Sequence, residues 1–298
     1  GGWPIDRDLE TFDTALSVCA FGEADLPVPR GDAVQEWLLR RQLTTECFAT
    51  SAAPGGWAWA MPAGWPDCDD TSYVLLALRT LGLHPGASTI ARGERWLAGM
   101  QNSDGSWSTF VRNSSMPFDH DCPYITGHVL SALKSTGYVD RHPRVLRRAL
   151  AYLARAQRHD GSFASLWFRE ATAGTASVLE ALAACGLART PCALRARDAL
   201  LRSQNDDGGW AGLRLQTSTA EETAWAVFAL LRYESDPSVR EAVTGGIAWL
   251  VANQLSDGTW TPAPIGLYYS AMWYSDSAFA LTLPAQALGR AKSCHGTL

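Results

Sequence analysis

Three carboxylates stand within four positions, at Asp67, Asp69 and Asp70 in the stretch Pro66–Asp67–Cys68–Asp69–Asp70–Thr71. The segment that follows, residues 73–78, is apolar almost all round, which predicts a buried helix. Acids at the start of a buried helix are unfavourable unless they cap it or do chemistry. Burial and the like charges of Asp67 and Asp70 would favour the protonated form of Asp69, so this stretch is a candidate general acid.

The stretch belongs to a repeat of about 50 residues, a period typical of repeat architectures. Each unit contains a turn that ends in an aromatic residue. An amphipathic helix that ends in glutamine precedes the last four turns, and a degenerate copy ends at Gln42. The turns are Gly2–Trp3, Gly56–Trp57, Gly105–Trp107, Gly161–Phe163, Gly208–Trp210 and Gly258–Trp260, and the four glutamines are Gln101, Gln157, Gln204 and Gln254.

A second, more apolar helix follows each turn and opens on threonine or serine. Amphipathic outer helices paired with apolar inner helices, six times over, predict an all-α protein, a closed (α/α)6 toroid around a central cavity. We expect one α/α-barrel domain over residues 1–298. Only five outer helices are visible, which predicts an upstream helix or a partner domain beyond Gly1. The expected openings are Thr14, Thr71, Thr126, Thr175, Thr223 and Ser277.

Aligning the inner helices on these residues separates the three acids. The position of Asp70 is acidic in four of the six repeats, so we interpret Asp70 as a residue that either caps its helix or satisfies the helix dipole. The repeat explains Asp69 less well and Asp67 less still. Two places after the Thr/Ser, one helix along the ring, stands His128. It is either a core histidine or a partner of Asp69.

Composition limits the possible functions. The chain has 298 residues, of which 47% are hydrophobic and 10% aromatic, with 13 Trp and a net charge of −5. Without a Lys/Arg block, this charge argues against nucleic acid as a partner. Seven scattered cysteines without a CxxC pair predict reduced thiols in a cytoplasmic protein. No apolar run spans a bilayer, and a peripheral membrane contact stays open.

The sequence resembles the class II terpene cyclases. Its Q-x-x-D-G-x-W turns are similar to the QW motifs of squalene–hopene and oxidosqualene cyclases, and residues 67–71 match the DxDDT motif. The resemblance extends over nearly the whole chain. It implies that Asp69 protonates a terminal alkene of an isoprenoid substrate, with Asp67 and Asp70 beside it and His128 hydrogen-bonded to it.

Within this superfamily, Tyr124 and Asp276 depart from the hopene cyclase pattern, whereas residues 219–224 look more like bacterial class II diterpene cyclases. The resemblance therefore implies a linear prenyl diphosphate, farnesyl or geranylgeranyl diphosphate, as the substrate. Squalene, cyclised as in the hopene cyclases, is the alternative. The aspartate-rich metal motif of class I synthases is absent from the sequence.

A cyclase of this kind needs a dry cavity whose aromatic faces shield carbocations. Candidates for this lining are Trp65, Tyr73, Tyr124, Trp167, Phe168, Trp225, Tyr268, Tyr269, Trp273 and Phe279. A diphosphate would need cations at the mouth. Arg7, Arg112 and Arg169 are the candidates, with Mg²⁺ carried by the substrate diphosphate and no dedicated metal site in the protein.

Three other interpretations remain. A protein prenyltransferase-like toroid would need zinc, for which Asp121, Cys122 and His128 are the candidate ligands. A carbohydrate-active toroid would pair Asp69 with Glu221. The third is a toroid fragment or scaffold that is inactive without its partner domain.

Overall fold

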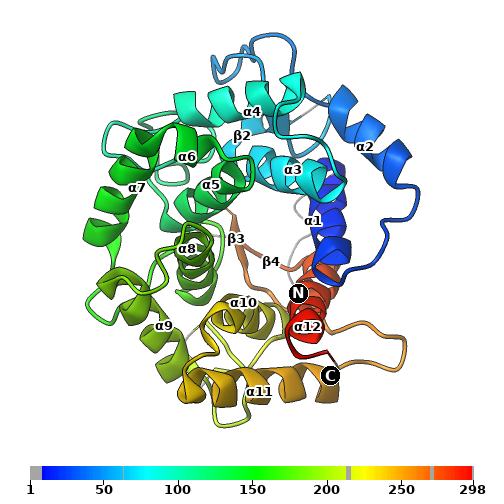
Figure 1. Ribbon diagram of the computed structural model, residues 1–298, viewed down its shortest axis with the longest axis vertical. Helices are drawn as coiled ribbons and strands as arrows, with labels where there is room; N and C mark the ends of the chain where they lie inside the picture. Colours follow the sequence, from blue (N-terminus) through cyan, green and yellow to red (C-terminus); the bar gives the residue numbers. More distant parts are fainter. Residues whose placement is uncertain (1–8, 63, 213–215, 269–271, 297–298) are drawn as a thin grey trace.

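A computed structural model describes residues 9–62, 64–212, 216–268 and 272–296. The described residues form two concentric rings of helices (Figure 1). The inner ring contains α1 (Glu10–Glu23), α3 (Cys68–Thr80), α5 (Pro123–Ser135), α8 (Thr172–Ala184), α10 (Ala220–Leu230) and α12 (Ser277–His295). The outer ring contains α2 (Gly31–Arg40), α4 (Ser88–Gly99), α7 (Pro143–Ala156), α9 (Pro191–Ser203) and α11 (Pro237–Ala252). The predicted toroid of six inner helices is confirmed, and residues 1–3 lie outside the described part of the chain.

The two rings form because the two kinds of helix differ in apolar pattern. In α10 every residue except Phe228 is buried, whereas α7 buries only Ala149, Tyr152 and Leu153. A helix that is apolar on all sides needs neighbours on all sides, and a helix with one apolar stripe covers a surface. Consecutive inner helices therefore pack together, and α12 packs against α1 to close the ring.

The tryptophan turns join the rings through hydrogen bonds. Trp210 donates its indole Nε1–H to the Leu200 carbonyl of α9 at 2.8 Å and its backbone N–H to Thr223 Oγ1 of α10 at 2.9 Å. Trp57 and Trp107 make the same two kinds of bond. The threonine that recurs in each of these inner helices is thus the acceptor for the turn. The described inner helices that carry these threonines begin three residues before them, so Thr71, Thr126, Thr175 and Thr223 do not open their helices as predicted.

The glutamines join neighbouring repeats. Gln204 Nε2 donates to the Gly208 carbonyl of its own turn at 2.8 Å and to the Ala242 carbonyl of α11 at 2.9 Å. Gln42, in the degenerate copy, bonds the carbonyls of Gly55 and Thr89 in the same way. Each side chain satisfies a carbonyl of a tight turn and ties it to the next outer helix.

A buried ion-pair cluster holds α12 to the ring. Arg290, 5% exposed, bonds Glu23 of α1 and Glu180 of α8, each at 2.7 Å. Its guanidinium also lies over the ring of Phe228 in α10. A buried guanidinium needs several acceptors to offset its desolvation, and here they come from three different helices.

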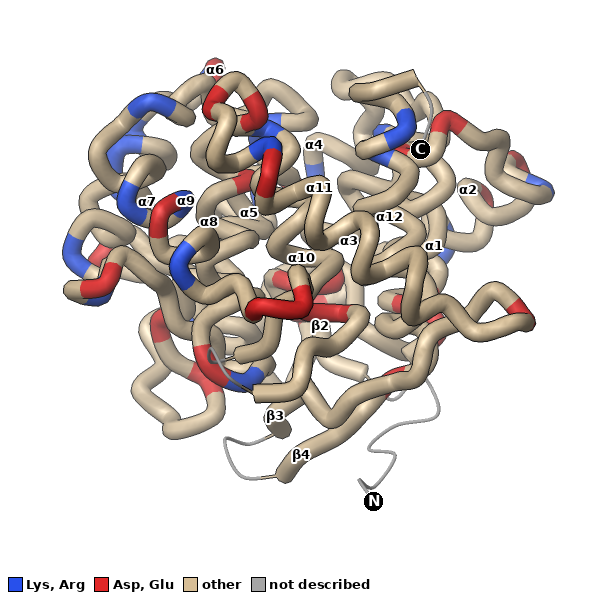
Figure 2. The backbone as a smooth tube through the Cα atoms, turned by 90° about the horizontal axis from the view of Figure 1, so that it is seen from below, with Lys and Arg blue, Asp and Glu red and all other residues tan. Residues whose placement is uncertain are grey.

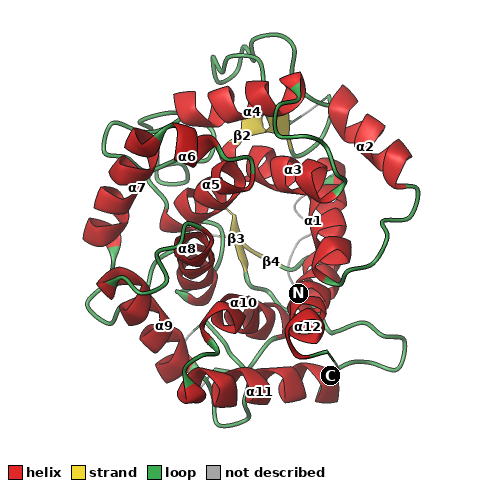
Figure 3. Ribbon diagram, viewed as in Figure 1, coloured by secondary structure: helices red, strands yellow, loops and turns green. Residues whose placement is uncertain are grey.

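The short strands are a feature that the sequence did not predict. β1 (Trp57–Ala58) pairs antiparallel with β2 (Pro66–Asp67), and β3 (Gly266–Tyr268) pairs with β4 (Met272–Tyr274). Figure 3 shows them in yellow, with β3 and β4 crossing the central opening of the ring. The short segments α6 (Tyr138–Arg141) and η1 (Leu231–Tyr233) complete the described elements.

Two further observations bear on the expected environment. None of the described helices combines the length and apolar character that crossing a bilayer requires. All seven cysteines are free thiols, as the sequence predicted.

We predict that replacing Gln204 by Ala lowers the free energy of unfolding by about 1–3 kcal/mol, because two carbonyls lose their donor. Gln254→Ala is the matched control: in the described structure, Gln254 is exposed and bonds only the Gly258 carbonyl of its own turn. Its loss should be less than half as large. Urea unfolding followed by circular dichroism measures both, and equal losses would contradict the role of the inter-repeat bond.

Candidate active site

The carboxylate-rich stretch lies where β2 meets α3. Asp67 pairs with Trp57 across the two-stranded sheet and is the N-cap of α3, because its Oδ1 accepts the backbone N–H of Asp70 at 2.7 Å. Of the two roles predicted for Asp70, the cap is therefore excluded and the dipole role remains. Asp70 lies in the first turn of the helix, where the helix dipole favours an acid. The cap residue is the earlier aspartate because the chain leaves the strand there with extended backbone angles.

Asp67 and Asp70 are both buried, at 2% and 4% exposure. Burial raises the pKa of Asp70 well above its usual range, and the charge of Asp67 raises it further. Burial also raises the pKa of Asp67, but the hydrogen bonds from Asp70 oppose this effect. Two adjacent buried carboxyls cannot both ionise readily, so the proton of the pair resides on Asp70. Within the described structure, Asp70 Oδ1 is buried without a hydrogen-bond partner.

Asp69 points away from this pair and bonds His128. The Oδ1 atom of Asp69 lies 2.6 Å from His128 Nδ1 of α5, and the two side chains are 14% and 15% exposed. The other ring nitrogen, Nε2, lies 3.5 Å from the hydroxyl of Tyr73. The structure thus brings together Asp69 and the histidine that the sequence placed one helix along the ring.

A layer of aromatic rings closes the middle of the toroid beneath Asp69. Neighbouring rings meet edge-on or tilted, with centroids 4.3–5.8 Å apart. Such geometries are favourable for aromatic pairs. The rings of this layer belong to Phe12, Tyr73, Tyr124, His128, Phe168, Trp225 and Phe279.

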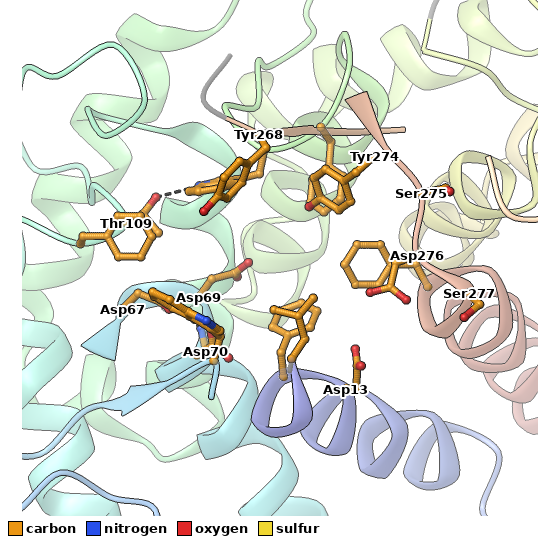
Figure 4. Close-up of a pocket in the computed structure, with 17 residues that line it drawn as sticks. Asp13, Asp67, Asp69, Asp70, Thr109, Tyr268, Tyr274, Ser275, Asp276 and Ser277 are labelled. Atoms are coloured by element: carbon orange, nitrogen blue, oxygen red, sulfur yellow. Dashed lines mark hydrogen bonds between the residues drawn. The ribbon is translucent and has the colours of Figure 1, made fainter. Parts of the chain in front are cut away.

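Above this layer lies a cavity of about 400 Å³, on the side where the inner helices begin. Figure 4 shows Asp69 extending into it from α3, with Tyr268 and Tyr274 on the opposite side. Five aspartates line it, and none of the described lining residues is a lysine or an arginine. The lining consists of Leu9, Phe12, Asp13, Trp59, Asp67, Asp69, Asp70, Thr109, Phe110, Trp167, Phe168, Tyr268, Tyr274, Ser275, Asp276, Ser277 and Phe279.

The predicted cavity residues fall into three groups. Trp167, Phe168, Tyr268 and Phe279 line the cavity. Tyr73, Tyr124 and Trp225 lie in or just below the aromatic layer, and they border a smaller void beneath it. Trp65 and Trp273 are 41% and 49% exposed and do not line the cavity. Tyr269 lies outside the described residues.

Sequence analysis missed Trp59 and Phe110, which line the cavity. Phe110 packs against Trp59 and Trp167, with centroids 5.8 Å away in each case. The completely buried Asp119 places Phe110, since its carboxylate accepts the backbone N–H groups of Thr109, Phe110 and Val111 at 2.7–3.1 Å. An isolated aspartate in a loop carries no repeat signal that could have revealed this role.

The arginines predicted to bind diphosphate are engaged elsewhere. Arg169 Nε donates to Glu222 at 3.1 Å, and Arg112 Nε donates to the Gln101 carbonyl at 2.9 Å. Neither arginine lines the cavity, so the structure does not support these two assignments. Arg169 turns inward because Glu222, 1% exposed, requires a counter-charge. Arg7 lies outside the described residues.

The residues of the zinc and carbohydrate alternatives do not form those sites. Among the described residues there is no group of three His, Cys, Asp or Glu that could hold a metal ion. Asp121 accepts the Tyr152 hydroxyl, and His128 bonds Asp69, so this pair does not converge with Cys122. Glu221 is fully buried, accepts the Ala263 N–H at 2.9 Å and does not line the cavity with Asp69.

Many basic residues lie on the outer helices. In Figure 2, blue segments gather along the outer helices α7 and α9, while red marks the acidic stretch at β2 inside the ring. The cavity is therefore an aromatic chamber with a carboxyl-rich wall. This arrangement suits proton donation and attraction of a cation, and it disfavours an anion.

Comparison with solved structures identifies the class of fold. The toroid superimposes on a type II terpene cyclase from Scytonema with a TM-score of 0.77, at 19% identity over 99% of this chain and 91% of that one. It also matches ent-copalyl diphosphate synthase from Streptomyces platensis, with a TM-score of 0.72, at 23% identity over 94% of this chain and 50% of that one. The fold is thus that of the class II terpene cyclases.

The sequence comparisons identify the family within this class. The family described as squalene-hopene cyclase C-terminal domain matches residues 10–293, and the chain belongs to this family. Squalene–hopene cyclase of Alicyclobacillus acidocaldarius is 33% identical over 98% of this chain and 52% of its own length. Drimenyl diphosphate synthase of Streptomyces showdoensis is 31% identical over 89% of this chain and 47% of its own length. The chain spans about half the length of these relatives.

We predict that Asp13→Asn reduces the pH dependence of stability. Burial and then the charge of Asp276 raise the pKa of Asp13 from its ordinary 3.8 to about 7. Between pH 4 and pH 7 the unfolded chain releases a proton that the folded chain keeps on Asp13. The contribution of Asp13 to stability is therefore complete below pH 4 and is lost as the pH rises to 7. At pH 7 the free energy of unfolding of the variant should exceed that of the wild type by roughly 1–3 kcal/mol.

Urea unfolding at pH 4.5 and pH 7 tests this prediction. Asp257→Asn is the control, because its bonds to Thr259 lower the pKa of Asp257 and move its titration below this window. A wild-type pH dependence in Asp13→Asn would show that Asp13 is not protonated in the folded chain.

Proposed function

We propose that this chain catalyses protonation-initiated cyclisation of a linear isoprenoid, with Asp69 as the general acid. The observation that carries the proposal is the position of Asp69. Its carboxyl group faces an aromatic cavity and bonds His128 at 2.6 Å, while the adjacent Asp67 and Asp70 are held in the helix cap. Family membership and the fold support the same chemistry.

In this mechanism Asp69 gives its proton to the distal alkene of the substrate. His128 Nδ1 holds one carboxyl oxygen, so the second oxygen carries the proton into the cavity. A donor N–H stabilises the carboxylate that remains after transfer. A well-placed general acid contributes roughly 10²–10⁴ in rate.

The aromatic rings protect the resulting cation. Phe12, Phe168 and Phe279 lie on the cavity side of the aromatic layer, and Trp59, Phe110 and Trp167 form the adjacent wall. Each aromatic face that meets a cation contributes about 0.5–2 kcal/mol.

We propose a linear prenyl diphosphate, farnesyl or geranylgeranyl diphosphate, as the substrate. The likeness to drimenyl diphosphate synthase supports this choice, and a cavity of about 400 Å³ is near the small end for ligand pockets. The Scytonema cyclase has been solved with geranylgeranyl dihydroxybenzoate, another isoprenoid. Squalene, as in the hopene cyclases, is the second candidate because the family match and the Alicyclobacillus relative favour it.

The polar head of a diphosphate substrate would lie outside the carboxyl-rich cavity. Five aspartates around the cavity would repel it, and the part of the lining that the structure describes contains no lysine or arginine. The hydrocarbon tail then enters first and brings its distal alkene to Asp69. The described residues contain no donor set for Mg²⁺, so we assign no step to a metal and expect any Mg²⁺ to travel with the diphosphate.

We further propose that the apolar rim of the cavity packs against another domain. Met61, Trp65, Met272 and Trp273, each 41–50% exposed, come from the two segments that border the cavity. A second helical domain is the favoured partner because the curated relatives are about twice as long. Binding of the chain to neutral phospholipid vesicles, lost in the Trp65→Ser/Trp273→Ser variant, would assign the rim to a membrane surface instead.

The general acid is tested with Asp69→Asn. Farnesyl diphosphate, geranylgeranyl diphosphate and squalene are each incubated with the wild-type chain and the variant, and the products are read by mass spectrometry after dephosphorylation. We expect a cyclic isomer of one substrate from the wild type and at least about a 10²-fold lower rate from the variant.

Asp257→Asn is the control for this experiment, since Asp257 is exposed in a turn far from the cavity lining and should keep the wild-type rate. Equal rates for Asp69→Asn and the wild type would exclude Asp69 as the acid. A wild-type chain that cyclises none of the three substrates would count against the proposed function.

A further inference from the structure

A second pair of acids lines the cavity away from Asp69. Asp13 lies in α1 and Asp276 directly precedes α12, so neither belongs to the carboxylate-rich stretch. Figure 4 shows Asp69 and Asp70 on one side of the cavity and Asp276 on the other, with Asp13 between them on α1. A substrate that places its distal alkene at Asp69 therefore extends toward Asp276.

The two acids of this pair differ in protonation. Asp276 is the N-cap of α12, and its Oδ1 accepts the Ala278 N–H at 2.8 Å. This bond and the positive end of the helix dipole favour the ionised form. Asp13 receives no such bond in the described structure, where its Oδ1 is buried without a partner. Two neighbouring carboxyls share one proton, which here resides on Asp13 and leaves Asp276 charged.

The pKa directions agree with this assignment. Burial and the charge of Asp276 raise the pKa of Asp13 to about 7. Burial also raises the pKa of Asp276, but the Ala278 N–H opposes the rise. The α12 side of the cavity thus contains the carboxylate of Asp276, while the proton of the pair stays on Asp13.

We infer, building on the proposed function, that the Asp276 carboxylate is the base that ends the reaction. The cation left by ring closure lies toward the α12 side. Asp276 removes a proton from a carbon next to the cationic carbon, and the electrons of that C–H bond form a C=C bond. Asp69 has lost one proton and Asp276 has gained one, so the product is an isomer of the substrate.

The other lining groups are less suited to this role. Asp67 Oδ1 is occupied by the helix cap, and Asp70 holds the proton of its pair. Ser275, Ser277, Tyr268 and Tyr274 offer neutral hydroxyls, which are far weaker bases than a carboxylate. The negative charge of Asp276 also attracts the cation as it moves away from Asp69.

Asp276→Asn tests the inference, because asparagine keeps the cap bond to Ala278 and removes the base. The chain and the variant are incubated with the substrate that the wild type cyclises. Loss of the base leaves the cation to be captured by water, and the alcohol is heavier than the alkene by one water. We expect the ratio of cyclic alkene to cyclic alcohol to fall by at least about tenfold while substrate consumption continues.

Asp236→Asn is the matched control. Asp236 caps the outer helix α11 by accepting the Ser238 N–H at 3.0 Å, and it should keep the wild-type product ratio. Equal melting temperatures for the two variants show that the caps are preserved.

The outcomes separate the two proposals. An unchanged alkene-to-alcohol ratio in Asp276→Asn, with the wild type active, would overturn Asp276 as the base and leave the proposed function intact. A folded variant that consumes no substrate would place Asp276 in initiation and also overturn the inference. A wild-type chain that forms no cyclic product would overturn the proposed function itself.

Discussion

The hydrogen bond between Asp69 and His128 is the interaction on which the site depends. A carboxyl group at the start of a buried helix would normally be used as a cap, as Asp67 is used here. Asp69 does not have this role, and its Oδ1 atom is instead hydrogen-bonded to the imidazole of the next inner helix. The acid is therefore held at a wall of the cavity, and its position depends on how α3 packs against α5.

That packing comes from the two-layer ring. Inner helices that are apolar on nearly every side can exist only with neighbours on every side, and closure of the ring supplies them. The tryptophan and glutamine bonds of each turn set the spacing of inner and outer helices, and the Arg290 cluster fixes the last inner helix to the first. Helices thus carry Asp69 and His128, while a loop carries Phe110 and strand β3 carries Tyr268. A site that places a proton within bonding distance of one carbon benefits from this arrangement.

The cavity is uneven in charge. Five aspartates and, among the residues that the structure describes, no basic side chain line it, although the chain as a whole is only moderately acidic. Such a chamber repels anions and attracts a carbocation at every stage of a cyclisation. Neighbouring acids also restrain one another's ionisation, so protonated and charged carboxyls coexist at one pH. Proton donor and proton acceptor can therefore be built from the same residue type, separated by their hydrogen bonds.

The sequence by itself determined the ring architecture and pointed to Asp69 and His128 as neighbours on consecutive inner helices. The helix pairs of the ring repeat along the chain, and the acidic stretch and His128 stand out because they break the repeat. The repeats of one chain can therefore be compared with one another. Only the tertiary structure decided which aspartate caps α3, because the cap depends on where strand β2 ends. It also removed Arg112 and Arg169 from the cavity and added Trp59, Phe110 and Asp119. Loop conformation and the pairing of buried charges depend on contacts between distant segments, which no local pattern records.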